Sequence, residues 1–383
     1  MKCTWFAILL AVATPATADT PRARDLGIPF DGMPGALNAI TDVAGVTVGH
    51  TTLISTPDPK HEVRTGVTAI LPRGKQSVEV PVFGAWFALN GNGEMTGTTW
   101  LEEGGRLEGP VMLTNTHSVG VVHDAVIAWR VRLGQPDPSG YWWSTPVVAE
   151  TWDSYLNDVN GFHVRPQDVD AALDSARSGP VAEGNVGAGT GTVCHEFKCG
   201  IGTASRRVTI AKNPYIVGVL VQANYGVRDT LRIAGVPVGR HLKQHRMYPQ
   251  GAPDQGDTGS IIIVVATDAP LLPHQLKRIA RRAAIGLARN GSYAGNGSGD
   301  IFVAFSTANA GAMPNDAINS AAFLGNDLLD ALFLATVEAT EEAIINSMIA
   351  ARDMRGQDGH FVMAIPHEQL RTILKHYNRL KTR

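Results

Sequence analysis

The sequence is poor in cysteine, in net charge and in long hydrophobic runs. Three cysteines among 383 residues are too few for a small scaffold held by disulfides. The formal net charge is -2, so no strongly basic surface is expected and nucleic acid is an unsuitable partner. No segment reaches the roughly 18 uninterrupted apolar residues that a membrane-spanning helix needs. These absences exclude three common classes and leave a globular protein.

The composition that remains suits a protein with many tight turns. The chain is 44% hydrophobic and 18% charged, and its length suits one large domain or two ordinary ones. It contains 41 glycines, which permit tight turns and close approaches between backbone segments. We therefore expect loops packed around a site rather than a helical scaffold.

The first 18 residues have the pattern of a secretory signal peptide. Lys2 precedes an apolar stretch over residues 5–13, and Ala16-Thr17-Ala18 fits the small-residue cleavage pattern after Pro15. A membrane anchor would need a longer apolar run. We therefore expect export, to the bacterial periplasm or the medium, and no membrane attachment once residues 1–18 are removed.

Removal of the signal leaves two cysteines, Cys194 and Cys199. They lie close enough in sequence to close a small disulfide loop, but only geometry can decide whether they do. The sequence leaves this question open.

Strand-like and helix-like patterns alternate along the chain without an internal repeat. Expected strands cover residues 66–71, 81–89, 215–222, 260–267 and 301–306, and expected helices cover residues 119–133, 146–156, 168–177, 276–289, 336–354 and 367–377. The last three strands are continuous apolar runs, as expected of strands buried on both faces. In the helix 336–354, the acidic segment 338–344 is expected to face solvent.

A loop without apolar periodicity covers residues 243–259 and ends abruptly at a strand. Ser260 is therefore the first residue of a strand that should be central and buried. Gly259 lacks a Cβ atom, so the peptide bond before Ser260 can be strained and open to attack by the serine hydroxyl. Such an attack would move the acyl group from nitrogen to oxygen and give an ester, and hydrolysis of the ester would leave Ser260 with a free α-amino group and a free hydroxyl. A residue of this kind carries a nucleophile and a potential base together. The alternative is an ordinary turn glycine before a strand.

Two further segments carry polar side chains that can assist Ser260. Ser298 and Asp300 are two residues apart before the strand 301–306, so in an extended chain they point to the same face. Asn224 follows the strand 215–222, where a side-chain amide can donate to an oxyanion. A glycine-rich turn and a turn asparagine are the structural alternatives.

The chain resembles the family of L-aminopeptidase/D-Ala-esterase/amidases and bacterial β-aminopeptidases over essentially all of its mature length. The resemblance is carried by blocks in one order: ITDVAGVTVGH (40–50), GNGEMTG (91–97), VVAET (147–151), NDVNG (157–161), GAGTG (187–191), GIGTASR (200–206), VQANYG (221–226), GSI (259–261) and GSGD (297–300). This many blocks in order is far more specific than any single one.

The resemblance implies an α+β fold, a four-layer αββα sandwich like that of the N-terminal-nucleophile hydrolases. It implies self-cleavage between Gly259 and Ser260 into a larger chain of residues 19–259 and a smaller one of residues 260–383, which together form one catalytic domain. It also implies assembly of several processed pairs into a homo-oligomer. No cofactor and no metal are implied.

The resemblance also implies roles for particular residues. Ser260 is the nucleophile, Ser298 and Asp300 are its hydrogen-bonded partners, and Asn224 belongs to the oxyanion hole. Asp300 departs from relatives that have glutamate there, which shortens its reach by one methylene.

Two more residues match family positions that contact the substrate. Glu150 corresponds to the carboxylate that binds the free amino group of the substrate. Trp152 lies where an aromatic side chain lines the pocket, and where some relatives have tyrosine.

The expected function is a serine aminopeptidase that acts through an acyl-enzyme on short peptides, amides or esters. The general base is either the α-amino group of Ser260 or the Ser298–Asp300 pair. The sequence does not choose between L-, D- and β-amino acids as the first residue of the substrate. Alternatives are a related acyltransferase of the ornithine acetyltransferase type, which uses threonine, and a non-catalytic periplasmic binding protein.

Two local patterns favour other chemistries only weakly. The GAGTG segment at 187–191 lacks the spacing and the lysine of nucleotide-binding loops. His195-Glu196 begins like a zinc motif, but Cys199 occupies the position of the second histidine.

Overall fold

The computed structural model describes residues 20–58, 60–77, 79–134, 143–247, 257, 259–311 and 318–381. The predicted signal peptide and most of the loop before Ser260 lie outside the described residues.

The larger of two sheets carries the strand that begins with Ser260. Its order is β4-β3-β12-β11-β10-β9. The bounds are β3 Val82–Ala88, β4 Arg106–Leu107, β9 Ile201–Ile210, β10 Asn213–Asn224, β11 Ser260–Thr267 and β12 Gly299–Ser306. β11 and β12 run parallel, and the other pairings are antiparallel. β11 therefore has a hydrogen-bonded neighbour on each side.

The second sheet has the order β1-β2-β5-β6. Its strands are β1 Thr47–Asp58, β2 His61–Lys75, β5 Val111–Asn115 and β6 Val147–Thr151. β5 and β6 are parallel, and the remaining pairs are antiparallel.

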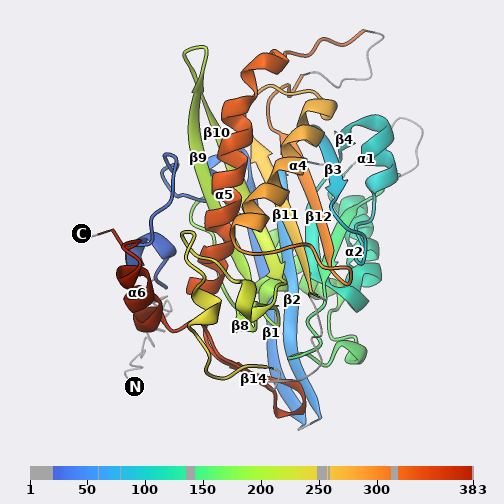
Figure 1. Cartoon of the computed structure of the whole chain (residues 1–383). Coiled ribbons are helices and arrows are strands. Elements are labelled where there is room, and N and C mark those ends of the chain that lie inside the picture. Colours follow the sequence, from blue (N-terminus) through green and yellow to red (C-terminus); the bar gives the residue numbers. More distant parts are fainter. Residues whose placement is uncertain are drawn as a thin grey trace, which may run out of the picture.

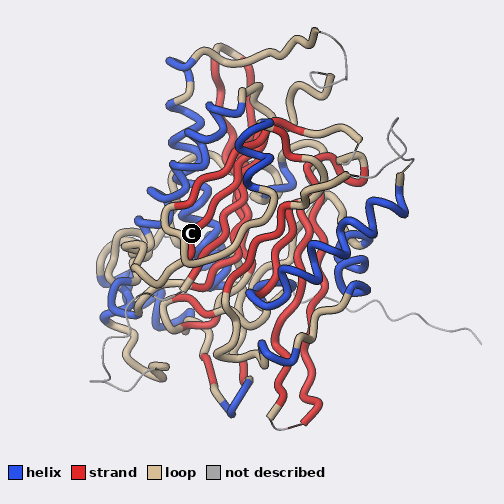
Figure 2. The backbone as a smooth tube through the Cα atoms, turned by 90° about the vertical axis from the view of Figure 1, so that its right-hand side faces the viewer, coloured by secondary structure: helices blue, strands red, loops and turns tan. Residues whose placement is uncertain are grey.

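Helices cover the outer face of each sheet, which gives four layers in the order αββα (Figures 1 and 2). On the six-stranded sheet lie α4 Pro273–Arg289 and α5 Asp330–Ile349, and on the four-stranded sheet lie α2 Val119–Leu133 and α3 Pro166–Asp174. The shorter helices are α1 Thr98–Gly104 and α6 His367–His376, and two small hairpins are β7 Val193–Cys194 with β8 Phe197–Lys198 and β13 Met354–Arg355 with β14 Phe361–Val362. The predicted fold class is confirmed.

The hydrophobic core forms three layers that match this architecture. Along β11, Ile261 and Ile263 pack in the cluster under α4 and α5, whereas Ile262 and Val264 pack in the cluster between the sheets. A third cluster lies between the four-stranded sheet and α2 and α3. Because side chains alternate along a strand, Ser260 shares the face of Ile262 and points between the two sheets.

The helix predicted over residues 146–156 is wrong. Val147–Thr151 forms β6, which pairs in parallel with β5 and is buried along its whole length. A short apolar run has no periodicity that separates a buried strand from a buried helix, and here the pairing with β5 decides.

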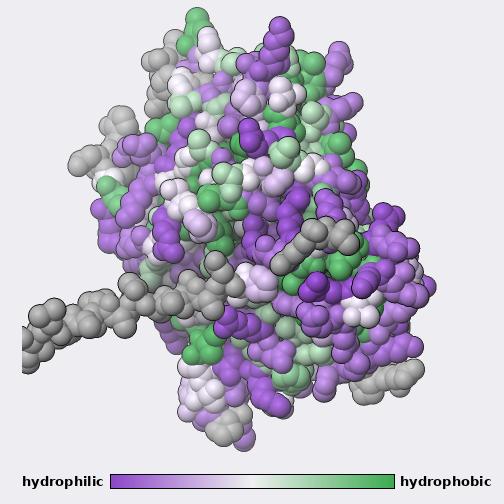
Figure 3. Space-filling view, turned by 90° about the vertical axis from the view of Figure 1, so that its left-hand side faces the viewer, coloured by the Kyte–Doolittle hydropathy of each residue, from purple (hydrophilic) through white to green (hydrophobic). Residues whose placement is uncertain are grey.

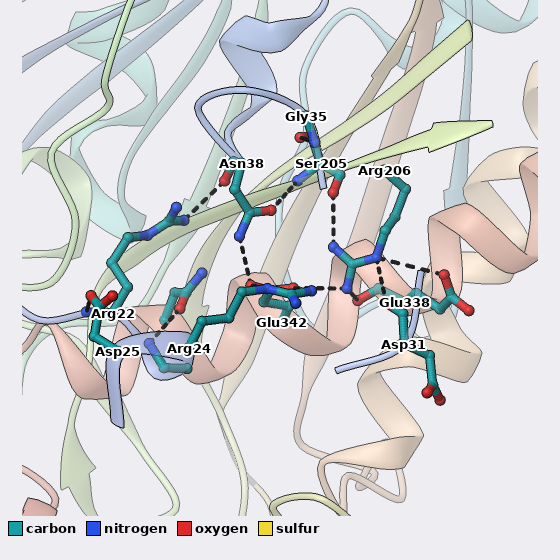
Figure 4. A network of polar contacts seen from close by, with 12 residues as sticks. Arg22, Arg24, Asp25, Asp31, Gly35, Asn38, Ser205, Arg206, Glu338 and Glu342 are labelled. Carbon is teal, nitrogen blue, oxygen red and sulfur yellow. Dashed lines mark hydrogen bonds and ion pairs between the residues drawn. The ribbon is translucent and has the colours of Figure 1, made fainter. Parts of the chain in front are cut away.

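The prediction that residues 338–344 face solvent is also wrong. Glu342 on α5 is buried and receives two hydrogen bonds of 2.7 Å from Arg24, while Nη2 of Arg206 lies 2.8 Å from it (Figure 4). Glu338 lies 3.5 Å from Nε of the buried Arg206. This network ties the N-terminal segment to β9 and α5.

The surface is mixed, and no described helix is long and apolar enough to span a bilayer. The face in Figure 3 shows hydrophobic residues in separate patches among polar ones.

Candidate active site

Ser260 begins β11 at the edge where the two neighbouring strands also present polar groups. In the register of the sheet it lies opposite Asn224 of β10 and beside Gly299 of β12. Ser260 is 5% exposed, and its hydroxyl makes no hydrogen bond to any described residue. Within the described residues, the buried hydroxyl therefore has no bond that would have to break before it attacks a neighbouring carbonyl.

The residue before Ser260 must be glycine. A Cβ atom on Gly259 would lie 2.1 Å from the carbonyl oxygen of Asn224 and 2.5 Å from Cα of Tyr225. The Gly259 carbonyl oxygen accepts a hydrogen bond of 3.1 Å from the Gly299 N–H. This bond holds the carbonyl in place and withdraws electron density from it.

Ser298 and Asp300 flank the residue that pairs with Ser260, and they are bonded to each other. Ser298 Oγ donates to Asp300 Oδ1 at 2.7 Å, and both residues are buried. The Asn90 side chain makes two hydrogen bonds to Asp300. Asn90 Oδ1 accepts from the Asp300 N–H at 2.6 Å, and Asn90 Nδ2 donates to Asp300 Oδ2 at 3.3 Å. Neither Ser298 nor Asp300 is bonded to the hydroxyl of Ser260 in this uncut chain.

The surroundings of Asp300 disfavour its charge. Burial is the largest cause and raises the pKa of Asp300 to about 6, although hydrogen bonds from Ser298 and Asn90 oppose the shift. The negative charge of Asp257 raises it further. A carboxyl group with this pKa can exchange a proton near neutral pH.

The side chain of Asn224 is held in one orientation. Its Oδ1 accepts a hydrogen bond of 2.9 Å from the Val193 N–H, and its Nδ2 has no acceptor among the described residues. Directly paired residues in an antiparallel sheet share a face, so Asn224 and Ser260 both point between the sheets. The amide therefore presents an N–H₂ group without an acceptor in the described part of the chain, on the same face as the serine.

Glu150 is at the end of β6 in the opposite sheet and is 3% exposed. One oxygen accepts from the Glu94 N–H at 2.9 Å, and the other accepts from the Thr116 hydroxyl. Burial raises its pKa, and these two hydrogen bonds oppose the shift. A Cβ atom on Gly93 would lie 3.3 Å from Glu150 Oε1 and 3.2 Å from Gly299 Cα, so Glu150 lies near the strand that flanks Ser260.

Trp152 follows β6 and is 46% exposed. Its neighbour in sequence, Asp153, is buried, and burial raises the pKa of Asp153 to about 7. Another exposed aromatic residue, Phe162, stacks on His117 at a centroid distance of 6.0 Å. The contact between Trp152 and a substrate stays a prediction.

Three buried polar atoms beside the predicted cut have no partner among the described residues: His195 Nε2, Tyr225 Oη and Asp257 Oδ2. Asp257 Oδ1 accepts from the Gly226 N–H at 2.8 Å, and the Tyr225 carbonyl accepts from the His195 N–H at 2.7 Å. Burial lowers the pKa of His195 to about 4, so the imidazole is neutral. Polar groups that have no partner in the described part of the chain are thus buried around the Gly259–Ser260 bond.

Cys194 and Cys199 form a disulfide with a Cα–Cα distance of 5.6 Å. It closes the β7–β8 hairpin, and β7 contains Val193, which holds the Asn224 amide.

Sequence reasoning did not single out Asn90, Thr116, Tyr225, Asp257 or Lys198. Asn90 adjoins the GNGEMTG block and Tyr225 lies within VQANYG, so the matching blocks were a signal for both. Thr116, Asp257 and Lys198 have no local pattern of their own.

Comparison with known proteins decides the family. A family signature described as "Peptidase family S58" matches residues 38–362. The chain belongs to peptidase family S58. This S58 peptidase is an aminopeptidase or amidase with the fold of the N-terminal-nucleophile hydrolases.

The relatives of this S58 peptidase match over nearly their whole length. It is 53% identical to the beta-peptidyl aminopeptidase BapA of Sphingosinicella microcystinivorans, over 97% of this chain and 96% of that protein. The structure of the L-aminopeptidase D-Ala-esterase/amidase of Ochrobactrum anthropi is 50% identical, with a TM-score of 0.88 over 94% of this chain and all of that one. A Burkholderia sp. beta-aminopeptidase is 44% identical, with a TM-score of 0.84 over 95% of this chain and 100% of that one.

Proposed function

We propose that this S58 peptidase cuts itself between Gly259 and Ser260 and then uses Ser260 as an N-terminal nucleophile. The products are a chain of residues 19–259 and a chain of residues 260–383. The observation that carries the proposal is the placement of Ser260, which lies opposite Asn224, beside Gly299 and directly after a glycine that tolerates no Cβ atom.

The self-cleavage begins with attack of Ser260 Oγ on the carbonyl carbon of Gly259. The bond between the Gly259 carbonyl and the Gly299 N–H supports this step, because the same N–H can stabilise the negative oxygen that develops. The peptide bond breaks as the acyl group moves from nitrogen to oxygen. Water then hydrolyses the ester and leaves Ser260 with a free α-amino group.

In the mature enzyme the same hydroxyl would attack the amide or ester carbonyl that follows the first residue of a substrate. Asn224 Nδ2 would donate to the oxyanion, since Val193 already holds Oδ1. The leaving amine or alcohol departs from the acyl-enzyme, and water then releases the first residue.

Two groups can take the proton of Ser260, namely its own α-amino group and Asp300 acting through Ser298. The hydrogen bond of 2.7 Å between Ser298 and Asp300 favours the second group, because it couples a hydroxyl to a carboxylate on either side of Gly299, the residue that pairs with Ser260.

Glu150 would select substrates with a free amino group. Its carboxylate is buried and held by the Glu94 N–H and the Thr116 hydroxyl, which leaves it poised for a cationic partner. We include β-peptides among the substrates, together with aminoacyl amides and esters, because relatives named beta-peptidyl aminopeptidase and D-Ala-esterase/amidase are about equally similar. Trp152 would contact the side chain of the first residue.

We also propose that the protein is exported and works in the periplasm or the medium as a homo-oligomer of processed pairs. The signal-like segment 1–18 supports export, and the Cys194–Cys199 disulfide supports an oxidising compartment.

Denaturing electrophoresis with N-terminal sequencing tests the cut. The native protein should give two bands, the smaller beginning Ser-Ile-Ile-Ile. Ser260→Ala should give one uncut band. A native protein that stays intact after folding, or a Ser260→Ala variant that still splits, would contradict the proposal.

A further inference from the structure

Lys198 at the end of β8 is fully buried and has no part in the chemistry described so far. Its Nζ atom donates to three main-chain carbonyl oxygens, those of Gly189 at 3.3 Å, Thr192 at 2.8 Å and Cys199. An ammonium group has three protons, so all of them are used. A neutral amine has only two and would leave one carbonyl without a donor.

One of these carbonyls belongs to the peptide group that orients Asn224. The Thr192 carbonyl accepts from Lys198, and the N–H of the same peptide group, on Val193, donates to Asn224 Oδ1 at 2.9 Å. A continuous series therefore runs from the ammonium group, through one peptide group, to the side-chain amide opposite Ser260.

Hydrogen bonds in such a series strengthen one another. A cation on a peptide oxygen draws electron density from the peptide nitrogen and makes its N–H a stronger donor. That donor acts in turn on the oxygen of the Asn224 amide, so Nδ2 becomes a stronger donor as well. The series ends at Asn224 Nδ2, which has no acceptor among the described residues. This group can therefore donate a hydrogen bond to a substrate oxygen.

We propose that Lys198 is a positioning residue that fixes and polarises the Asn224 amide through the Thr192–Val193 peptide group. This inference rests on the oxyanion role proposed above for Asn224.

A residue with a purely structural role at position 198 would not need a charge. Burial lowers the pKa of Lys198 to about 7, and the negative charge of Asp153 opposes that shift. A methionine has a similar length and would fill the same space without the penalty of burying a cation. The three carbonyl oxygens around Nζ match the three donors of the protonated form.

The test compares the processed forms of Lys198→Met and Lys198→Gln with native enzyme and with Lys277→Met, a substitution of a lysine that binds Glu102 on the surface. We expect kcat to fall about tenfold in Lys198→Met with KM changed less than about twofold, and Lys198→Gln to lie between. Affinity for an aminoalkylboronic acid, which forms a tetrahedral adduct with serine, should fall in parallel with kcat. Lys277→Met should behave as native. A rise in KM with unchanged kcat would mean that Lys198 only supports the local fold.

The same substitution in an Asn224→Ala background separates this inference from the proposed function. If Lys198 acts through Asn224, the second substitution should change kcat less than about twofold, whereas independent effects would multiply. If the effects on kcat multiply, the proposed role of Lys198 is wrong but the oxyanion role of Asn224 stands. The same conclusion follows if Lys198→Met keeps the native kcat while Asn224→Ala loses most of it. An undiminished kcat in Asn224→Ala overturns the oxyanion role and the inference with it.

A measurement on the native enzyme decides the question if the Lys198 variants do not fold. In a crystal structure of the boronate adduct, Asn224 Nδ2 should lie within hydrogen-bond distance of a boronate oxygen, with Lys198 Nζ still on the Thr192 carbonyl. A displaced Lys198 Nζ or an amide turned away from the adduct would overturn the inference.

Discussion

Asn224 lies directly opposite Ser260 in the antiparallel pairing of β10 with β11. Asn224→Asp keeps an oxygen that can accept from Val193 but replaces the donor N–H₂ group with a second oxygen. We expect kcat to fall by at least about 10²-fold, since removal of one oxyanion donor has that effect in known enzymes. Steady-state kinetics on processed enzyme measure this, and a variant that keeps more than a tenth of native kcat would contradict the role.

Gly259→Ala should slow the self-cleavage. Its Cβ atom would collide with the Asn224 carbonyl oxygen at 2.1 Å, so the peptide bond before Ser260 must move. We expect the uncut chain to persist at least about ten times longer, because small displacements of reacting groups are costly. Gly325→Ala is the control, since its Cβ atom meets nothing within 4 Å. Equal processing of both variants in a time course on gels would show that the collision does not matter.

The pH dependence of kcat/KM should identify the base. Asp300 must be ionised to accept a proton, and burial raises its pKa to about 6, so activity should be lost as the pH falls through about 6. If the α-amino group were the base, the loss would begin near its ordinary pKa of about 7.7 instead. Asp300→Asn should remove the limb near 6 and most of the activity, and Asp300→Glu should restore a carboxylate limb. A limb unchanged by Asp300→Asn would exclude this residue.

Glu150→Gln should affect substrate binding rather than chemistry. Loss of one partner of a buried charge pair costs about 2–5 kcal/mol, so kcat/KM for aminoacyl amides should fall by about 30-fold or more. Thr116→Val removes one hydrogen bond to the same carboxylate, and the free energy derived from kcat/KM should change by about 1 kcal/mol. If Glu150→Gln hydrolyses aminoacyl amides at native efficiency, Glu150 does not recognise the amino group.

Glu342→Gln should destabilise the protein by about 3–5 kcal/mol, because it leaves Arg24 and the buried Arg206 without their shared carboxylate. Glu341→Gln, one residue away, removes a more exposed pair with Arg289 and should cost at most about 1 kcal/mol. Unfolding by denaturant compares the two variants. Equal losses would mean that the network in Figure 4 adds little.

Sequence patterns predict the helices and strands whose bounds depend on the residues within them. The strand predicted from Ser260 to Thr267 has the bounds of β11, and the helix predicted from His367 differs from α6 by one residue at its end. Local patterns fail where long-range contacts decide. Val147–Thr151 becomes a strand because β5 lies beside it, and no nearby residue indicates that pairing.

Buried charges are the hardest features to predict from sequence. Glu342 has partners more than 130 residues away, and Lys198 is held by main-chain carbonyls that any sequence could supply. Charged residues are usually exposed, so composition alone places both on the surface. The candidate site residues other than Trp152 could be proposed from the sequence because they fall within matching blocks, whereas the groups that orient them could not.

The position of β11 between β10 and β12 has a consequence for the life of the enzyme after the proposed cut. The smaller chain would keep its hydrogen bonds on both sides, so no dissociation need follow. Should the pair unfold, however, recovery would require two separate molecules to find each other and to place β11 and β12 of the smaller chain between β10 and β3 of the larger one. Folding would then be a one-time event carried out by the uncut precursor. The lifetime of the mature enzyme would be set by its rate of unfolding and not by its ability to refold.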